Sequence, residues 1–135
     1  MFTFETKIRV RYAETDQMGY VYYGNYATFY EIGRVEMLRS LGTSYKSLEE
    51  GGIMMPVLEM HNKFIKPARY DEELLIRVHM KQKPAVKIAF EYELFNELGE
   101  LINTGSTTLA FVDMKRNRPC KAPADFMNRL SEYFD

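Results

Sequence analysis

The chain has 135 residues, which fits one domain and leaves little room for a second. Its apolar share of 46% and charged share of 27% are typical of a globular protein, and nothing in the composition indicates disorder. The formal net charge of -1 provides no overall field that would attract nucleic acid or an anionic membrane. Any anionic ligand therefore needs a local basic cluster.

The sequence shows no secretory or membrane signal. The segment from Met1 to Lys7 lacks the apolar stretch of a signal peptide, and no segment approaches the roughly 20 apolar residues of a membrane span. Cys120 is the single cysteine, so an internal disulfide and CxxC-type metal motifs are excluded. We therefore expect a cytoplasmic protein in a reducing setting.

The first elements are a strand, a loop and a helix. Apolar and polar residues alternate from Thr3 to Tyr12, which predicts a strand with one side in solvent. A loop follows from Ala13 to Gly24. From about Asn25 the apolar spacing changes to three and four residues, which predicts a helix of about five turns that Gly42 ends. Gly33 costs roughly 1 kcal/mol inside this helix relative to alanine, so we expect another backbone to approach it closely.

The remainder of the chain is mostly strands. Thr43 to Gly52 is short and helical or irregular, and Ala124 to Phe134 predicts a short terminal helix. Between them, extended segments are predicted over Ile53 to Lys66, Leu74 to Met80, Val86 to Phe95 and Leu101 to Asp113.

This order of elements limits the fold. One long helix followed by a meander of strands excludes a doubly wound βαβ fold. It predicts an α+β architecture in which a five-stranded antiparallel sheet wraps around one long central helix. Such a sheet leaves an open edge or face, and isologous dimerisation is one common way to cover it.

Two segments resemble a known family. Val10 to Tyr26 contains an acidic residue, then Asp16, then Gly19, an apolar pair and an aromatic residue before Asn25 enters the helix. Lys63 to Asp71 matches a turn of the same family. Together they resemble the 4-hydroxybenzoyl-CoA thioesterase-like proteins, a group that includes the acyl-CoA thioesterases linked to the Tol-Pal system. The resemblance implies a single hotdog thioesterase domain over residues 1–135.

The resemblance implies that Asp16 is the catalytic carboxylate of an acyl-CoA thioesterase. A carboxylate with an ordinary pKa of about 3.9 is ionised at neutral pH. It can attack the thioester carbonyl to give a mixed anhydride, or it can deprotonate a water molecule. The sequence does not separate these two routes. Without the surrounding motif, a turn residue would be the preferred explanation of Asp16, and the motif favours catalysis.

The resemblance also implies an oxyanion hole at the start of the helix, made by backbone N–H groups near Tyr23 and Gly24. Relatives carry His or Tyr at the position of Tyr23, so a mechanism assisted by imidazole is disfavoured here. The Tyr23 side chain is either catalytic or packs against the sheet. Glu31 is a second candidate carboxylate, although pairing with Arg34 or Arg11 explains it better.

Several further residues are candidates for substrate binding. The resemblance implies contacts at Gly19, Val21, Gly24 and Asn25 in the loop and at His61 in the acyl pocket. Phosphates of coenzyme A need basic side chains near the site. The candidates are Lys63, Lys66, Lys81, Lys83, Lys87, Arg116 and Arg118, with Lys63 and Lys66 preferred. His61 and His79 have no ligand spacing that would form a metal site, and no cofactor is expected.

Two other functions fit the same fold. Hotdog hydratases rely on a catalytic histidine in or near the central helix, and the predicted helix contains none. A non-catalytic protein that binds acyl-CoA or acyl carrier protein would not need Asp16. The 10 tyrosines and 9 phenylalanines suit an aryl or a short aliphatic acyl group, and either coenzyme A or acyl carrier protein as its carrier. Because the family builds its sites between subunits, we expect a homodimer or homotetramer.

Overall fold

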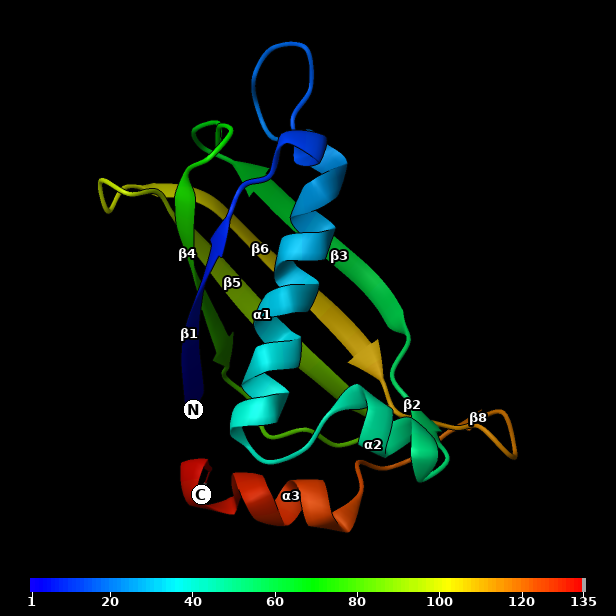
Figure 1. Ribbon diagram of the computed structural model, residues 1–135. Helices are drawn as coiled ribbons and strands as arrows, with labels where there is room; N and C mark the ends of the chain where they lie inside the picture. The colour runs from blue at the N-terminus through cyan, green and yellow to red at the C-terminus, as the bar shows by residue number, and fades with distance from the viewer. Residues whose placement is uncertain (135) are drawn as a thin grey trace.

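The computed structural model describes residues 1–134. One long helix, α1 (Tyr26–Ser40), lies across a five-stranded antiparallel sheet, which confirms the predicted α+β architecture (Figure 1). The strands follow the order β1-β4-β5-β6-β3 across the sheet. Their bounds are β1 (Phe2–Arg9), β3 (Val57–Phe64), β4 (Glu73–Met80), β5 (Lys87–Phe95) and β6 (Leu101–Ala110).

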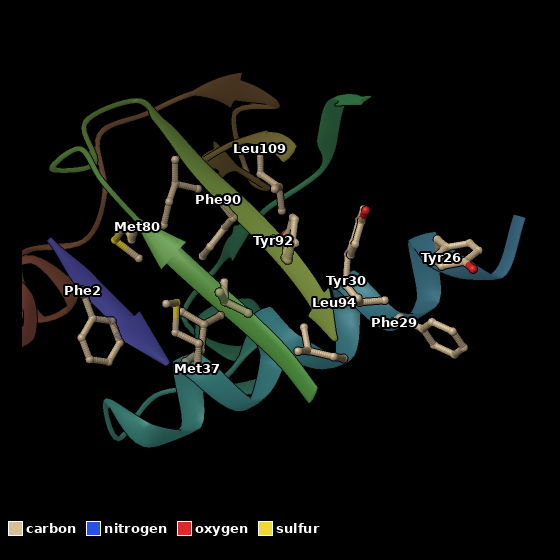
Figure 2. Close-up of a cluster of buried hydrophobic side chains, with 14 of the residues drawn as sticks. Phe2, Tyr26, Phe29, Tyr30, Met37, Met80, Phe90, Tyr92, Leu94 and Leu109 are labelled. Carbon is tan, nitrogen blue, oxygen red and sulfur yellow. The ribbon is translucent and has the colours of Figure 1, made fainter. Parts of the chain in front are cut away.

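The core lies between α1 and the face of the sheet that the helix covers (Figure 2). Alternate residues of β4 and β5 are buried, as their alternating pattern predicts, while the residues between them face outward. Gly33 brings α1 close to β4, because a Cβ atom there would lie 2.8 Å from Val78 and 3.0 Å from Ile76. The predicted close approach is therefore made to side chains of the sheet rather than to another backbone.

The position of β3 differs from the predicted meander. Only β4, β5 and β6 follow one another as neighbours, whereas β3 pairs with β6 at the far edge of the sheet. The place beside β4 is taken by β1, which pairs with it from Phe2↔Met80 to Arg9↔Glu73. As a result, β3 has one unpaired edge.

Short elements close the end of the molecule opposite the loop that precedes α1 (Figure 1). Two of the predicted long strands break, and their ends form β2 (Ile53–Met54) and β7 (Val112–Asp113) of a second sheet. The third strand of this sheet, β8 (Arg118–Pro119), was not predicted. The predicted short helices are α2 (Tyr45–Glu50) and α3 (Ala124–Leu130). None of the helices within residues 1–134 has the length and apolarity to cross a bilayer.

Candidate active site

Asp16 opens a tight turn at the tip of the loop before α1. The turn is closed by hydrogen bonds from Asp16 N to Tyr20 O at 2.8 Å and from Gly19 N to Asp16 O at 3.0 Å. Gly19 has a φ of 80°, a conformation that favours glycine. One carboxylate oxygen, Oδ1, accepts from Met18 N at 2.9 Å and from Tyr20 N at 3.3 Å. The other oxygen has no partner in residues 1–134, so the turn holds the carboxylate and leaves one oxygen available.

Backbone donors are also available where the loop enters the helix. A 3-10 turn, Tyr23–Asn25, precedes α1, and neither Tyr23 N nor Gly24 N donates to any group among the described residues. Neighbouring groups hold this turn in place: Tyr22 N donates to Glu14 O at 2.9 Å, and Asn25 Nδ2 donates to the same oxygen at 2.8 Å. Free N–H groups at the start of a helix stabilise a negative oxygen.

Glu14 holds the start of the loop in place through hydrogen bonds with Arg11. Its side chain is buried and accepts from Arg11 N at 2.7 Å and from Arg11 Nη2 at 3.0 Å. The same contact raises the pKa of the Arg11 guanidinium, first through the hydrogen bond and then through the charge of Glu14. Arg11 is thus engaged by Glu14 and not by Glu31, which forms no ion pair within residues 1–134. The anchoring role of Glu14 was not predicted from the sequence.

A cavity of about 280 Å³ lies between this loop and the end of β3. Its wall is mostly aromatic and aliphatic, and the rings of Tyr26 and Phe64 meet edge to face with centroids 5.3 Å apart. The lining residues are Asp16, Met18, Tyr20, Val21, Tyr23, Tyr26, Phe64, Ile65, Lys66 and Pro67. The cavity therefore has the Asp16 carboxylate in a wall that is otherwise mostly apolar.

The cavity brings together four of the residues singled out from the sequence: Asp16, Val21, Tyr23 and Lys66. Lys66 stands at the rim and hydrogen-bonds Glu100, and this contact lowers the pKa of the Glu100 carboxyl. Of the other loop candidates, Gly19, Gly24 and Asn25 shape the turn and the helix start without lining the cavity.

His61 and Lys63 lie elsewhere. They line a separate cavity of about 530 Å³ together with His79 and Lys81. Successive residues of a strand point to opposite faces, and Asn62 between them points towards the helix, so His61 and Lys63 face the outer side of the sheet. In one chain they are therefore separated from Asp16 by the sheet.

The histidines do not form a metal site in the part of the chain that the structure describes. No group of three or more His, Cys, Asp or Glu side chains there has the geometry to hold a metal ion. Cys120 is a free, partly buried thiol packed against the core.

Comparisons with known proteins identify the family and the fold. Residues 10–130 match the family described as the thioesterase-like superfamily. The acyl-CoA thioester hydrolase YbgC of Escherichia coli is 30% identical over 129 residues, which cover 96% of each protein. YneP of Bacillus subtilis is 33% identical over 119 residues, covering 88% of this chain and 86% of YneP. A crystal structure of a DHNA-CoA thioesterase from Staphylococcus aureus has a TM-score of 0.93 and 34% identity, covering 98% of this chain and 91% of that one.

Proposed function

The chain belongs to the thioesterase-like superfamily and is a thioester hydrolase with the hotdog fold, and we propose that Asp16 performs its chemistry on an acyl-CoA. The reaction adds water across the thioester and releases the free acid and coenzyme A. The proposal rests on two features of the same loop. One Asp16 carboxylate oxygen has no hydrogen-bond partner among the described residues, and the backbone N–H groups of Tyr23 and Gly24 donate to none of them.

The free oxygen of Asp16 suits either of two routes. In the first it attacks the carbonyl carbon, the C–S bond breaks, and water then hydrolyses the mixed anhydride. In the second it takes a proton from water as the water oxygen attacks, and that proton is passed to the departing thiolate. In both routes, negative charge develops on the carbonyl oxygen.

We assign the stabilisation of that charge to the N–H groups of Tyr23 and Gly24. They are free, they precede α1, and the helix dipole adds a partial positive charge at the same place. Loss of one donor from an oxyanion hole costs about 3 to 4 kcal/mol in a well-studied protease, so these groups supply a large part of the catalysis. Tyr23 itself is 66% exposed, and its ring stands beside that of Tyr22 at 4.7 Å.

A second copy of the chain would complete the site. Every residue of β3 except Asn62 is exposed, although one edge of the strand pairs with β6. Phe64, which lines the Asp16 cavity, is 52% exposed. Pairing of two β3 strands would satisfy the free edge and cover these apolar side chains. We therefore propose a homodimer, alone or as half of a tetramer, with each acyl pocket closed by the partner.

Lys66 is the basic residue best placed to meet the phosphates of coenzyme A, because it lies at the cavity rim. His61 and Lys63 face the other side of the sheet, so we do not assign them to the pocket of the same chain. Acyl carrier protein is the alternative to coenzyme A as the carrier of the acyl group in the same reaction.

The test is release of coenzyme A, followed by thiol detection, on aryl, short, medium and long acyl-CoAs and on acyl carrier protein thioesters. We expect turnover that falls by about a hundredfold or more in Asp16→Asn. Asp113→Asn is a matched control, because Asp113 Oδ1 accepts from Lys115 N and Arg116 N in a similar turn far from the cavity.

If turnover is unchanged in Asp16→Asn, another group performs the catalysis, and Glu31→Gln is the next variant to assay. Acyl-CoA binding without turnover on any substrate would favour the non-catalytic binding protein and contradict the proposal. A hydratase remains disfavoured, because α1 contains no histidine.

A further inference from the structure

One backbone carbonyl holds both ends of the 3-10 turn that precedes α1. Glu14 O accepts from Tyr22 N at 2.9 Å and from Asn25 Nδ2 at 2.8 Å, which uses both of its lone pairs. These two donors flank Tyr23 and Gly24, whose N–H groups we assign to the oxyanion hole. The positions of the two N–H groups therefore depend on where the Glu14 carbonyl lies.

The other polar groups of Glu14 are engaged by Arg11, which follows β1. The Glu14 carboxylate accepts from Arg11 N at 2.7 Å and from Arg11 Nη2 at 3.0 Å, and Glu14 N donates to Arg11 O at 3.0 Å. The side chain is buried, so a carboxylate without these partners would be costly. Glu14 therefore moves only together with the backbone of Arg11.

Asp16 is connected to the same residue through the chain. Only Thr15 separates Asp16 from Glu14, and Thr15 is extended, with a φ of -100° and a ψ of 155°. Two hydrogen bonds to Tyr12 O hold Thr15, one from its N at 3.2 Å and one from its Oγ1 at 2.8 Å. Both parts of the proposed site, the carboxylate and the backbone donors, are thus placed relative to Glu14.

Hydrogen bonds, more than packing, fix the position of Glu14. Its side chain borders a cavity of about 250 Å³ between β1, the loop and α1. The lining residues are Ile8, Arg9, Arg11, Glu14, Phe29 and Ile32. Because this cavity leaves space beside the loop, a shorter or neutral side chain would let the loop shift. Glu14 is not among the residues that line the Asp16 cavity, so it does not form a wall for the acyl group.

We propose that Glu14 is a positioning residue of the thioesterase reaction, which sets the distance between the Asp16 carboxylate and the two oxyanion donors. The inference rests on the proposed function. It assigns the same role to the Asn25 side chain, which the sequence predicts to bind substrate but which donates to Glu14 O. A misplacement of reacting groups by about 1 Å can lower the rate about a hundredfold. Binding of the acyl group depends on the walls of the Asp16 cavity and is left unchanged.

The first test separates kcat from KM in Glu14→Gln. The amide keeps an oxygen for Arg11 N but turns an NH2 group towards the Arg11 guanidinium, so that two donors face each other. For an acyl-CoA that the native chain hydrolyses, we expect kcat to fall by about tenfold or more and KM to stay within about twofold. A rise in KM at constant kcat, or no change in either, overturns the inference.

A binding measurement excludes the trivial explanation that part of the variant is unfolded. A thioether analogue of the acyl-CoA, which cannot be hydrolysed, is titrated by calorimetry into the native chain and into Glu14→Gln. We expect the same stoichiometry and the same Kd for both, because the cavity walls are intact. A stoichiometry that falls in proportion to kcat would overturn the inference and leave Glu14 with a role in folding alone.

Glu72→Gln is the matched control. Glu72 Oε1 accepts from Arg69 N at 2.7 Å and Glu72 N donates to Arg69 O at 3.3 Å, the same arrangement that Glu14 makes with Arg11. The Glu72 carbonyl, however, accepts from Val10 N and not from the turn before α1. Glu72→Gln should therefore keep kcat and KM near the native values. A fall in kcat equal to that of Glu14→Gln would contradict a specific role for Glu14.

Asn25→Ala tests the same carbonyl and leaves Glu14 and Arg11 unaltered, so it also covers the case in which Glu14→Gln does not fold. We expect kcat to fall by about tenfold with KM unchanged. The double variant with Glu14→Gln should lose less than the product of the two single effects, because both act through one carbonyl. A rise in KM would make Asn25 a substrate-binding residue and overturn its assignment here.

Crystal structures of the native chain and of Glu14→Gln provide a readout that does not need turnover. We expect Tyr23 N and Gly24 N to move by about 0.5 Å or more relative to Asp16, while β4 and β5 superpose. Unmoved donors overturn the inference, whatever the activity of the chain. Moved donors together with full turnover in Asp16→Asn would refute the proposed function instead, so the two failures are distinguishable.

Discussion

Tyr30 and Tyr92 are buried tyrosines of the core, and Tyr45 of α2 is a half-buried tyrosine beside Arg34. Burial raises the pKa of Tyr30 well above its ordinary range. It also raises the pKa of Tyr92 and of Tyr45, although Arg34 acts in the opposite direction on both. The Arg34 side chain is buried and donates to Tyr45 at 2.6 Å and to Tyr92 at 3.4 Å. The interior thus contains a guanidinium whose partners are neutral phenols.

These shifts predict a loss of stability at alkaline pH. The folded pKa of each tyrosine is raised above its unfolded value of about 10, so the stabilisation is complete below that pH and is lost as the pH rises towards the folded pKa. We expect the free energy of unfolding in urea to fall steadily above about pH 10. In Tyr30→Phe, which has one fewer group to ionise, the slope of this decline should be smaller. An equal slope in both chains would contradict the assignment.

The candidate site could be predicted only where a local pattern specifies it. Asp16 and Tyr23 lie in a continuous motif, and the structure places both in one cavity. The face to which β3 side chains point depends on its pairing with β6, which no short segment encodes, so the sequence does not show that His61 faces the outer side of the sheet. Gly105 interrupts a strand, which indicates a close approach by another group, and the structure shows that this group is the Tyr30 hydroxyl.

At the level of elements, alternation predicts β1, β4 and β5 and fails at β3. In β4 and β5 the apolar residues face α1 and the polar residues face outward. Strand β3 shows no such contrast in burial, because all its residues except Asn62 are exposed, whether apolar or polar. Its place beside β6 depends on contacts between distant segments, as does the pairing of β1 with β4 from Phe2↔Met80 to Arg9↔Glu73. The length of α1 was slightly overestimated, because its first turn is a 3-10 turn.

The C-terminal end of α1 is closed by the motif that Gly42 predicts. Gly42 N donates to Arg39 O at 2.9 Å and Thr43 N to Leu38 O at 3.1 Å, with Gly42 at a φ of 80°. Arg129 of α3 adds a third contact, from its Nη1 to Leu41 O at 3.0 Å. This contact joins the central helix to the C-terminal helix.

We expect Arg129→Met to lower the free energy of unfolding by about 1 kcal/mol, the usual value of a charged hydrogen bond at a helix C-terminus. The measurement is urea unfolding at neutral pH. Arg39→Met is the matched control, because Arg39 lies in the last turn of α1 but its side chain pairs with Glu36 on the exposed surface. Its effect should stay below about 0.5 kcal/mol. Equal effects of the two substitutions would mean that the contact with Leu41 adds nothing.

For the molecule as a whole, the free edge of β3 and the incomplete cavity have one common explanation. The strand ends at Phe64, whose ring is a wall of the Asp16 cavity, so whatever covers β3 also covers that wall. A strand with one unpaired edge and exposed Val57, Leu58 and Met60 favours pairing with another strand. The second copy proposed above would provide the same edge in a symmetric contact, which would account for both features at once.

This explanation is tested by placing a charge on the edge. Leu58, in β3, and Leu98, in the hairpin between β5 and β6, are both exposed, at 53% and 84%. Lysine on an edge strand opposes pairing, so Leu58→Lys should sediment as a 15.9 kDa monomer and lose most of its thioesterase activity. Leu98→Lys should keep the dimer and the activity. If Leu58→Lys sediments as a monomer and stays fully active, one chain contains the whole active site, and a partner is not needed to close the acyl pocket.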